Sequence, residues 1–232
     1  MSKTSFNKFN KWLNNNWIIT IFSTMFGIIA GLYINDYFQN KALLESKQDA
    51  MVQVLRELDD NHSALEDYHN TLKTKYEAFD VVINYISNDL ELLVPADTLD
   101  AFLSQVKPIF TLEAQEPLPG DLLRLRGDMD MNITSKLVAA RLTDIIWNSF
   151  KETNYMSVTS FECLTGIESI YHAQDEVNKI NAEWKSVFFR GEFLTNPTLT
   201  KSFMSQWNDL LLKQGLLLKM YELRESFIIN CE

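Results

Sequence analysis

The chain is poor in the two residues that most often interrupt helices. Of its 232 residues only 7 are glycine and 5 are proline. Long stretches therefore carry no helix breaker, because the prolines are confined to a few positions. A hydrophobic content of 46% with 12% aromatic residues excludes a disordered chain, since it is enough to form a packed core. We therefore predict an all-α fold.

Motifs for enzymatic or metal chemistry are also missing. There is no Gly-rich phosphate loop and no paired-cysteine zinc pattern, and none of the histidines at 62, 69 and 172 stands beside a nucleophile motif. Glu66 and His69 have the Glu-x-x-His spacing of di-metal bundles, but such a site needs matching carboxylates from other helices. We predict a non-enzymatic protein with no catalytic residue, cofactor or metal.

Basic residues are scarce outside the N-terminus. Residues 1–16 contain Lys3, Lys8 and Lys11 and no acid, so the remaining residues must carry −13 to give the net charge of −10. An acidic domain of this kind repels phosphate backbones. We predict that the chain does not bind nucleic acid.

One segment without charge, from Trp17 to Ile34, is 18 residues long. As a helix it would span ~27 Å, close to the ~30 Å hydrocarbon core of a bilayer. Trp12 and Trp17 at one end and Tyr33 and Tyr37 at the other lie where aromatic rings favour the headgroup zone. We predict a transmembrane helix over residues 17–34 in a lipid bilayer, with these four residues as interface anchors.

An alternative interpretation of this segment is a secretory signal peptide cleaved after Ala30. The apolar run continues past Ala30 without a turn signal, which favours an anchor. Three lysines precede the segment, whereas a mixture of acids and lysines follows it. By the positive-inside rule, residues 1–16 are cytoplasmic. In a bacterium the chain would lie in the inner membrane with its bulk in the periplasm.

Small residues recur every four positions within this segment, at Ser23, Gly27 and Gly31. In lipid, such a ridge lets two helix backbones approach closely and gain packing energy. The ridge predicts a partner within the membrane, either another membrane protein or a second copy of the chain. Glycine is also common in membrane helices in general, so the alternative is that these residues reflect that composition and not an interface.

Residues 35–94 contain neither Gly nor Pro and carry apolar residues at heptad intervals. The row consists of Leu44, Met51, Leu58, Leu65, Leu72, Phe79 and Ile86. A coiled coil needs a second apolar position three residues after each member of this row, and that position is apolar only in every other heptad. The sequence therefore has only half of a coiled-coil seam. We predict one long amphipathic helix that packs within the chain's own bundle, in preference to a homodimeric coiled-coil stalk.

Residues 95–232 are expected to complete an antiparallel helical bundle. The pattern predicts a short helix over 98–106 capped by Asp97, a loop over 111–120, and helices over about 135–150, 157–189 and 198–229. Pro197 suits the first turn of the last helix. The Arg126-Gly-Asp128 triplet lacks the ligand spacing of a calcium site and is interpreted as a solvated turn.

The two cysteines, Cys163 and Cys231, leave two states open. They form a disulfide if the domain lies in an oxidising compartment, or they are two buried free thiols. The count alone does not decide between these states.

Two stretches resemble a known protein family. The segment from Gly27 to Tyr37, with the pair Ile34-Asn35, leads into a charged helix and is similar to the opening of an uncharacterised family of single-pass membrane proteins of Bacteroidota. Residues 146–150 and 170–174 resemble the later helical pair of that family. The resemblance implies a bacterial inner-membrane location and a helical soluble part, and it transfers no active-site residue.

These features predict an accessory or scaffold subunit of an envelope complex that associates through its span and its helical domain. The alternative is a sensory or ligand-binding bundle on the extracytoplasmic side. Sixteen cytoplasmic residues are too few for a signalling module, so a sensor of this kind would act through a separate partner.

Overall fold

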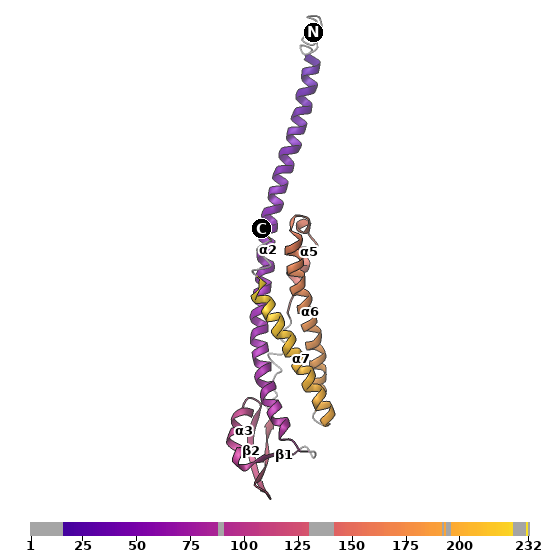
Figure 1. Ribbon diagram of the computed structural model, residues 1–232. Coiled ribbons are helices and arrows are strands. Elements are labelled where there is room, and N and C mark those ends of the chain that lie inside the picture. The colour runs from indigo at the N-terminus through magenta and orange to yellow at the C-terminus, as the bar shows by residue number, and fades with distance from the viewer. Residues whose placement is uncertain are drawn as a thin grey trace, which may run out of the picture.

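The computed structural model describes residues 16–87, 91–129, 142–191, 193, 196–224 and 231. Its main element is α2 (Asn16–Asn84), one unbroken helix of 69 residues that is about 100 Å long at 1.5 Å per residue. The N-terminal part of α2 extends alone, and the remaining elements gather around its second half (Figure 1). The apolar segment and the amphipathic segment therefore form a single helix. It ends at Asn84, ten residues before the predicted end.

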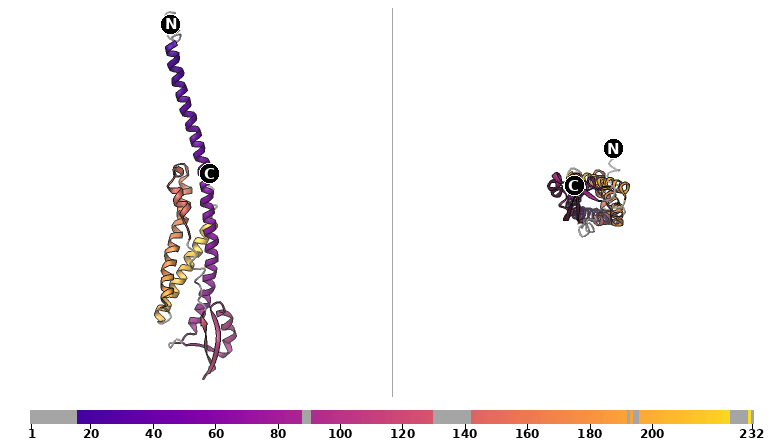
Figure 2. Two further views of the ribbon diagram at one scale, coloured as in Figure 1. Left: turned by 180° about the vertical axis from the view of Figure 1, so that it is seen from behind. Right: turned by 90° about the horizontal axis from the view of Figure 1, so that it is seen from below.

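Two further helices lie along the second half of α2, α6 (Phe161–Arg190) and α7 (Pro197–Glu222). Ser160 caps α6 by accepting a hydrogen bond from the Cys163 amide, and Gly191 ends it with a φ of 67°. Asn196 caps α7, with Pro197 in its first turn as the sequence predicts. The two helices are seen beside α2 in Figure 1 and, from behind, in the left view of Figure 2.

α7 runs antiparallel to α2, and the two helices meet in heptad steps. Their side chains pair as His62 with Tyr221, His69 with Gln214, and Tyr76 with Trp207. Five members of the predicted heptad row, from Met51 to Phe79, are buried inside the chain. Leu44 lies outside the bundle and is 47% exposed. The row therefore packs against the chain's own helices over residues 51–79.

α6 runs parallel to α2, which corrects the prediction of a simple antiparallel bundle. Asn61 of α2 donates to Gln174 of α6, and one heptad later Tyr68 donates to Asn181. Both partners advance in the same direction along the chain. This is possible because α5 (Ile145–Lys151) and the 3-10 helix η2 (Asn154–Val158) precede α6 at the end of the bundle nearer the N-terminus (Figure 1). The predicted start of a helix near residue 135 lies outside the described residues.

A small antiparallel sheet at the far end of α2 corrects the all-α prediction. Its strands β1 (Leu92–Pro95), β2 (Phe110–Leu118) and β3 (Leu122–Met129) lie in the order β1-β3-β2. The short helices η1 (Ala96–Thr98) and α3 (Leu99–Val106) connect β1 to β2. The N-cap of α3 is Thr98 and not Asp97.

The predicted loop over 111–120 is mostly strand β2, because β2 is an edge strand and an edge strand tolerates Pro117. The turn that follows uses positive φ at Gly120 and Asp121. The Arg-Gly-Asp triplet lies within β3 and not in a solvated turn. Gly127 is required there, since a Cβ at this position would collide with the carbonyl oxygen of Thr111.

Candidate functional site

The apolar part of α2 makes no packing contact with the domain. Over residues 19–84 the structure has one helix long and apolar enough to cross a membrane, and its most apolar stretch has a mean hydropathy of 1.4 with none of it buried. Ser23, Gly27 and Gly31 are all exposed on it. A Cβ added at either glycine would meet no atom within 4 Å. The small-residue ridge is therefore open to whatever surrounds this helix.

Three of the predicted interface anchors can be placed. Trp17, Tyr33 and Tyr37 are exposed on α2, and Tyr37 stacks edge-on with Phe38. Trp12 and the three N-terminal lysines lie outside the described residues. The exposed aromatic rings thus stand at both ends of the exposed apolar stretch, with Phe38 extending it by one turn.

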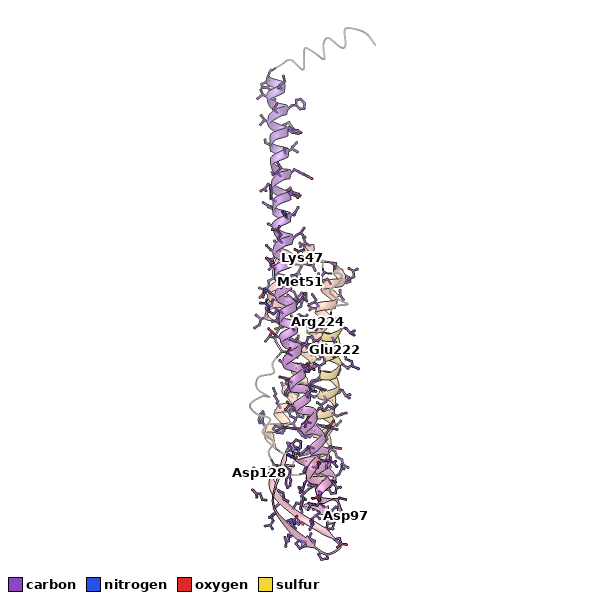
Figure 3. The ribbon with its side chains drawn as sticks, turned by 90° about the vertical axis from the view of Figure 1, so that its left-hand side faces the viewer. Lys47, Met51, Asp97, Asp128, Glu222 and Arg224 are labelled. Atoms are coloured by element: carbon purple, nitrogen blue, oxygen red, sulfur yellow. A yellow bond between two sulfur atoms is a disulfide. The ribbon has the colours of Figure 1, made fainter. Side chains whose placement is uncertain are left out.

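The packed domain begins at Lys47, about 20 Å along α2 from Ile34 at 1.5 Å per residue. The Lys47 side chain is only 4% exposed, and its Nζ donates to the carbonyl oxygen of Cys231 at 3.0 Å. Lys47 and Met51 mark this end of the domain, and Asp97 and Asp128 lie at the opposite end beside the sheet (Figure 3). The chain's C-terminal cysteine is therefore held at the end of the domain nearer the apolar segment.

Cys163 and Cys231 form a disulfide, with their Cα atoms 5.0 Å apart. This bond decides between the two states that the sequence left open. Cys163 lies in the first turn of α6, so the bond joins the start of α6 to the end of the chain. Together with the Lys47 contact, it ties residue 231 to two different helices.

A buried carboxylate, Glu57, lies inside the packed domain, at the end nearer the apolar segment of α2. The side chain is 5% exposed, and Oε1 accepts from the amide of Ile146 and the hydroxyl of Thr143, each at 3.1 Å. Oε2 accepts from the amide of Trp147 at 3.2 Å and the hydroxyl of Tyr171 at 2.8 Å. Two of these donors are free N–H groups in the first turn of α5. α2 thus supplies the carboxylate that caps α5.

A second polar layer lies next to this carboxylate. Asn61 and Gln174 both donate to the carbonyl oxygen of Thr143, and Tyr221 donates to Oε1 of Gln174 at 2.7 Å. The Thr143 amide donates back to Asn61 Oδ1 at 3.0 Å. The chain segment before α5 is therefore fixed by hydrogen bonds from α2 and α6. Such a layer specifies one packing arrangement, since a displaced partner would be left unpaired.

The phenols in this region stay protonated at neutral pH. Burial, and next the hydrogen bond to Glu57, raises the pKa of Tyr171 far above its usual value of 10.0. Burial also raises the pKa of Tyr221, with the charge on Glu57 adding to the effect. Burial raises the pKa of Tyr68 as well, partly offset by its bond to Asn181. These tyrosines act as fixed hydrogen-bond donors.

The raised tyrosine pKa values predict loss of stability in alkali. Above pH ~10 the unfolded chain releases phenol protons that the folded chain retains, so the free energy of unfolding falls as pH rises, by about 1.4 kcal/mol per pH unit for each tyrosine. Below that pH these groups contribute no slope. Burial raises the pKa of Tyr76 as well. Urea unfolding between pH 8 and 11.5 measures this, and Tyr68→Phe is expected to reduce the alkaline slope by about a quarter to a third. An unchanged slope in that variant would contradict the assignment.

The Glu57 carboxylate is hydrogen-bonded to groups of the protein itself. All four of its hydrogen-bond donors are protein groups, and Glu57, Tyr171 and Tyr221 line neither the groove beside His69 and Gly215 nor the groove beside Phe110 and Gly127. Within the described ranges, no group of three or more His, Cys, Asp or Glu residues could hold a metal ion. His69, which the Glu-x-x-His spacing had singled out, is hydrogen-bonded to Gln214 at 3.2 Å.

The buried polar residues of α2 do have a signal in the sequence, but that signal was interpreted as a defect of a coiled-coil seam. The second heptad row of α2 is interrupted by Lys47, Asn61 and Lys75, which suggested a half-made coiled-coil seam. Lys47 and Asn61 are buried and hydrogen-bonded to other parts of the chain, whereas Lys75 is half-buried. Glu57 follows the same rule, since a charged residue between Val54 and Leu58 on the buried face requires a partner.

Comparison with protein-family models, with curated proteins and with solved structures finds no match to this chain. The resemblance to a family of Bacteroidota membrane proteins therefore stays a prediction.

Proposed function

We propose that the chain is a membrane-anchored, non-enzymatic accessory or scaffold subunit, held by α2 in a bacterial inner membrane with residues 1–16 in the cytoplasm. The observation that carries the proposal is the continuity of α2 from the exposed apolar stretch into the packed domain. A buried core helix would have its apolar residues covered, but this stretch has none buried. A lipid bilayer supplies the missing cover.

The disulfide supports a periplasmic position for the domain. Disulfides persist in oxidising compartments such as the periplasm and are rare in the cytosol. The Cys163–Cys231 bond lies in the packed domain, on the C-terminal side of the span. This agrees with the orientation that the N-terminal lysines predict.

The partner contact is proposed to involve the small-residue ridge at Ser23, Gly27 and Gly31. Because a Cβ added at either glycine would meet no atom of the described residues within 4 Å other than the helix's own neighbouring backbone, the ridge can accept a second helix backbone. The partner is either a second copy or another membrane protein.

Bulky residues on the ridge are expected to remove this association. In Gly27→Leu/Gly31→Leu the added side chains keep two backbones apart, and we expect the crosslinked complex in native membranes to fall about tenfold, which is ~1.4 kcal/mol. Ile29→Phe is the matched control, because it adds bulk to the opposite face. A wild-type chain that crosslinks to nothing, or a double variant that crosslinks as well as wild type, would rule out the ridge as an interface.

A ligand-binding role is the second candidate, and one observation favours it. The helices α2 and α7 leave an open groove of about 630 Å³ between them. This volume lies within the range of small-molecule sites. The buried polar groups around Glu57 do not favour this role, since they form hydrogen bonds with one another.

A further inference from the structure

Gly215 keeps the groove between α2 and α7 open. It lies on the α7 side, opposite His69, and a Cβ added there would meet no atom within 4 Å other than the helix's own backbone and the His69 ring carbon Cε1, at 3.9 Å. Neither the backbone nor close packing therefore requires a glycine at this position. A larger side chain would fill the groove without straining the helix.

The floor of the groove is apolar and exposed. Leu212 and Leu216 both line it and are 60% and 59% exposed, although the opposite face of the same helix is buried. Leu211 lies beside them in the lining. Exposed apolar side chains that line a groove, as opposed to ones scattered singly, are typical of a binding surface.

One antiparallel register holds along the groove. His69 pairs with Gln214 and Tyr76 with Trp207, so a step of seven residues along α2 matches a step of seven back along α7. A position on one helix can therefore be located on the other by counting from these pairs.

Two lysines that line the groove stand at opposite ends of its floor. Counted from the two pairs, Lys73 of α2 lies level with Leu210 of α7. Lys219 is nine residues further along α7, which is about 13 Å at 1.5 Å per residue. Leu212 and Leu216 therefore lie between the two lysines.

Both lysine side chains lean inward over these leucines. In an α-helix the Cα–Cβ bond tilts toward the N-terminus of that helix. Because α2 and α7 run antiparallel, Lys73 leans toward His69 and Lys219 leans toward Leu216. Glu77, an acid in the lining, follows Lys73 by one turn and lies on the side away from the leucines. The groove thus carries one cation at each end and an apolar patch between them.

The positions of the two cations select the class of ligand. Neither lysine forms a salt bridge with another described residue, in a chain whose net charge is −10. An anionic ligand therefore complements this part of the surface. A molecule with a single acidic end would leave one lysine unmatched, whereas a molecule with an acid at each end matches both.

The apolar patch limits the length of the ligand. Residues 211–216 cover about 8 Å of α7, and about six methylene groups at roughly 1.3 Å each when extended span this length. A docked helix needs anchors over i, i+3, i+4 and i+7 or more, which a patch of this length does not supply.

We propose that the α2–α7 groove binds a small linear dicarboxylate, with one carboxylate on Lys73, the other on Lys219, and the methylene chain over Leu212 and Leu216. Octanedioate, with its six methylene groups, has the length that the patch accommodates. The proposal rests on the ligand-binding role and is independent of the scaffold role.

The test compares three acids by isothermal titration calorimetry on the full chain in lipid nanodiscs, with empty nanodiscs as the blank. Octanoate keeps the chain length of octanedioate but has one carboxylate, and butanedioate keeps both carboxylates but has a shorter chain. We expect octanedioate to bind about fivefold more tightly than octanoate, because it forms one more exposed ion pair. It is expected to bind about tenfold more tightly than butanedioate, which loses the contact with the leucines.

Variants connect this binding to the groove. In Lys73→Gln and in Lys219→Gln, octanedioate is expected to bind about fivefold more weakly. Octanoate is expected to lose no more than about twofold in either variant, because its single carboxylate can use the remaining lysine. Gly215→Leu is expected to abolish octanedioate binding by filling the groove. Gly215→Ala and Lys201→Gln are the matched controls, and far-UV circular dichroism checks that every variant is folded.

Three results would overturn the proposal. Equal affinity for octanedioate and octanoate would show that the second carboxylate has no partner. Octanedioate binding that persists in folded Gly215→Leu would place the site elsewhere. No heat of binding for octanedioate with the wild-type chain, together with no rise in melting temperature, would exclude this ligand class. The scaffold proposal would stand in each case, because crosslinking at the small-residue ridge tests it separately.

Discussion

Replacing Glu57 with alanine is expected to lower the free energy of unfolding by about 4 kcal/mol. The substitution leaves two amides at the start of α5 and the hydroxyls of Thr143 and Tyr171 without their acceptor. Each buried donor left unpaired costs about 1–3 kcal/mol, and some of this loss is recovered if water enters. Urea unfolding followed by tryptophan fluorescence measures the loss, since Trp147, Trp184 and Trp207 are buried.

A neighbouring acid on the same helix provides the control for this experiment. Glu66 is exposed on α2, and Glu66→Ala is expected to change stability by less than about 0.5 kcal/mol. Glu57→Gln keeps the shape of the side chain but only one acceptor oxygen, so an intermediate loss is expected. If Glu57→Ala and Glu66→Ala had equal effects, the carboxylate would not be the cap of α5.

Removal of the disulfide is expected to cost a similar amount. The bond joins residues 68 positions apart, and closing a loop of this length restricts the unfolded chain by about 4 kcal/mol. In Cys163→Ser/Cys231→Ser the unfolded state regains this freedom, and Lys47 loses the fixed position of the carbonyl that it contacts. The midpoint of urea unfolding should fall accordingly.

Reduction separates the bond from the substitution. Dithiothreitol should lower the stability of the wild-type chain to that of the double variant and should not change the double variant. In intact cells, thiol alkylation before and after reduction reports the state of both cysteines. Free thiols in the untreated cell would contradict both the disulfide and the periplasmic position.

The helical part of the fold could be predicted because its signals are local. The stretch of α2 that carries the heptad row contains neither Gly nor Pro, and Asn196-Pro197 marks the start of α7. The sheet was missed because its signals are not local. Pro117 suggests a loop unless β2 is known to be an edge strand, and that depends on the pairing of β3 with both neighbours.

The direction of α6 could not be predicted either. Short connections favour antiparallel neighbours, and the predicted bundle assumed them. The chain instead returns to the near end of the bundle before Phe161, where Glu57 and Asn61 bind the segment around Thr143. A polar residue within an apolar row indicates that a hydrogen-bonding partner exists elsewhere in the chain. It does not say which distant segment supplies that partner.

The unbroken course of α2 has a mechanical consequence. In the membrane-anchored arrangement that we propose, the ridge within the lipid and the groove outside it lie on one rod with no hinge between residues 16 and 84. A turn of the rod about its axis would rotate both surfaces through the same angle. A partner that binds the membrane-spanning part of α2 therefore also fixes the rotational orientation of the packed domain about the helix axis, without contacting that domain.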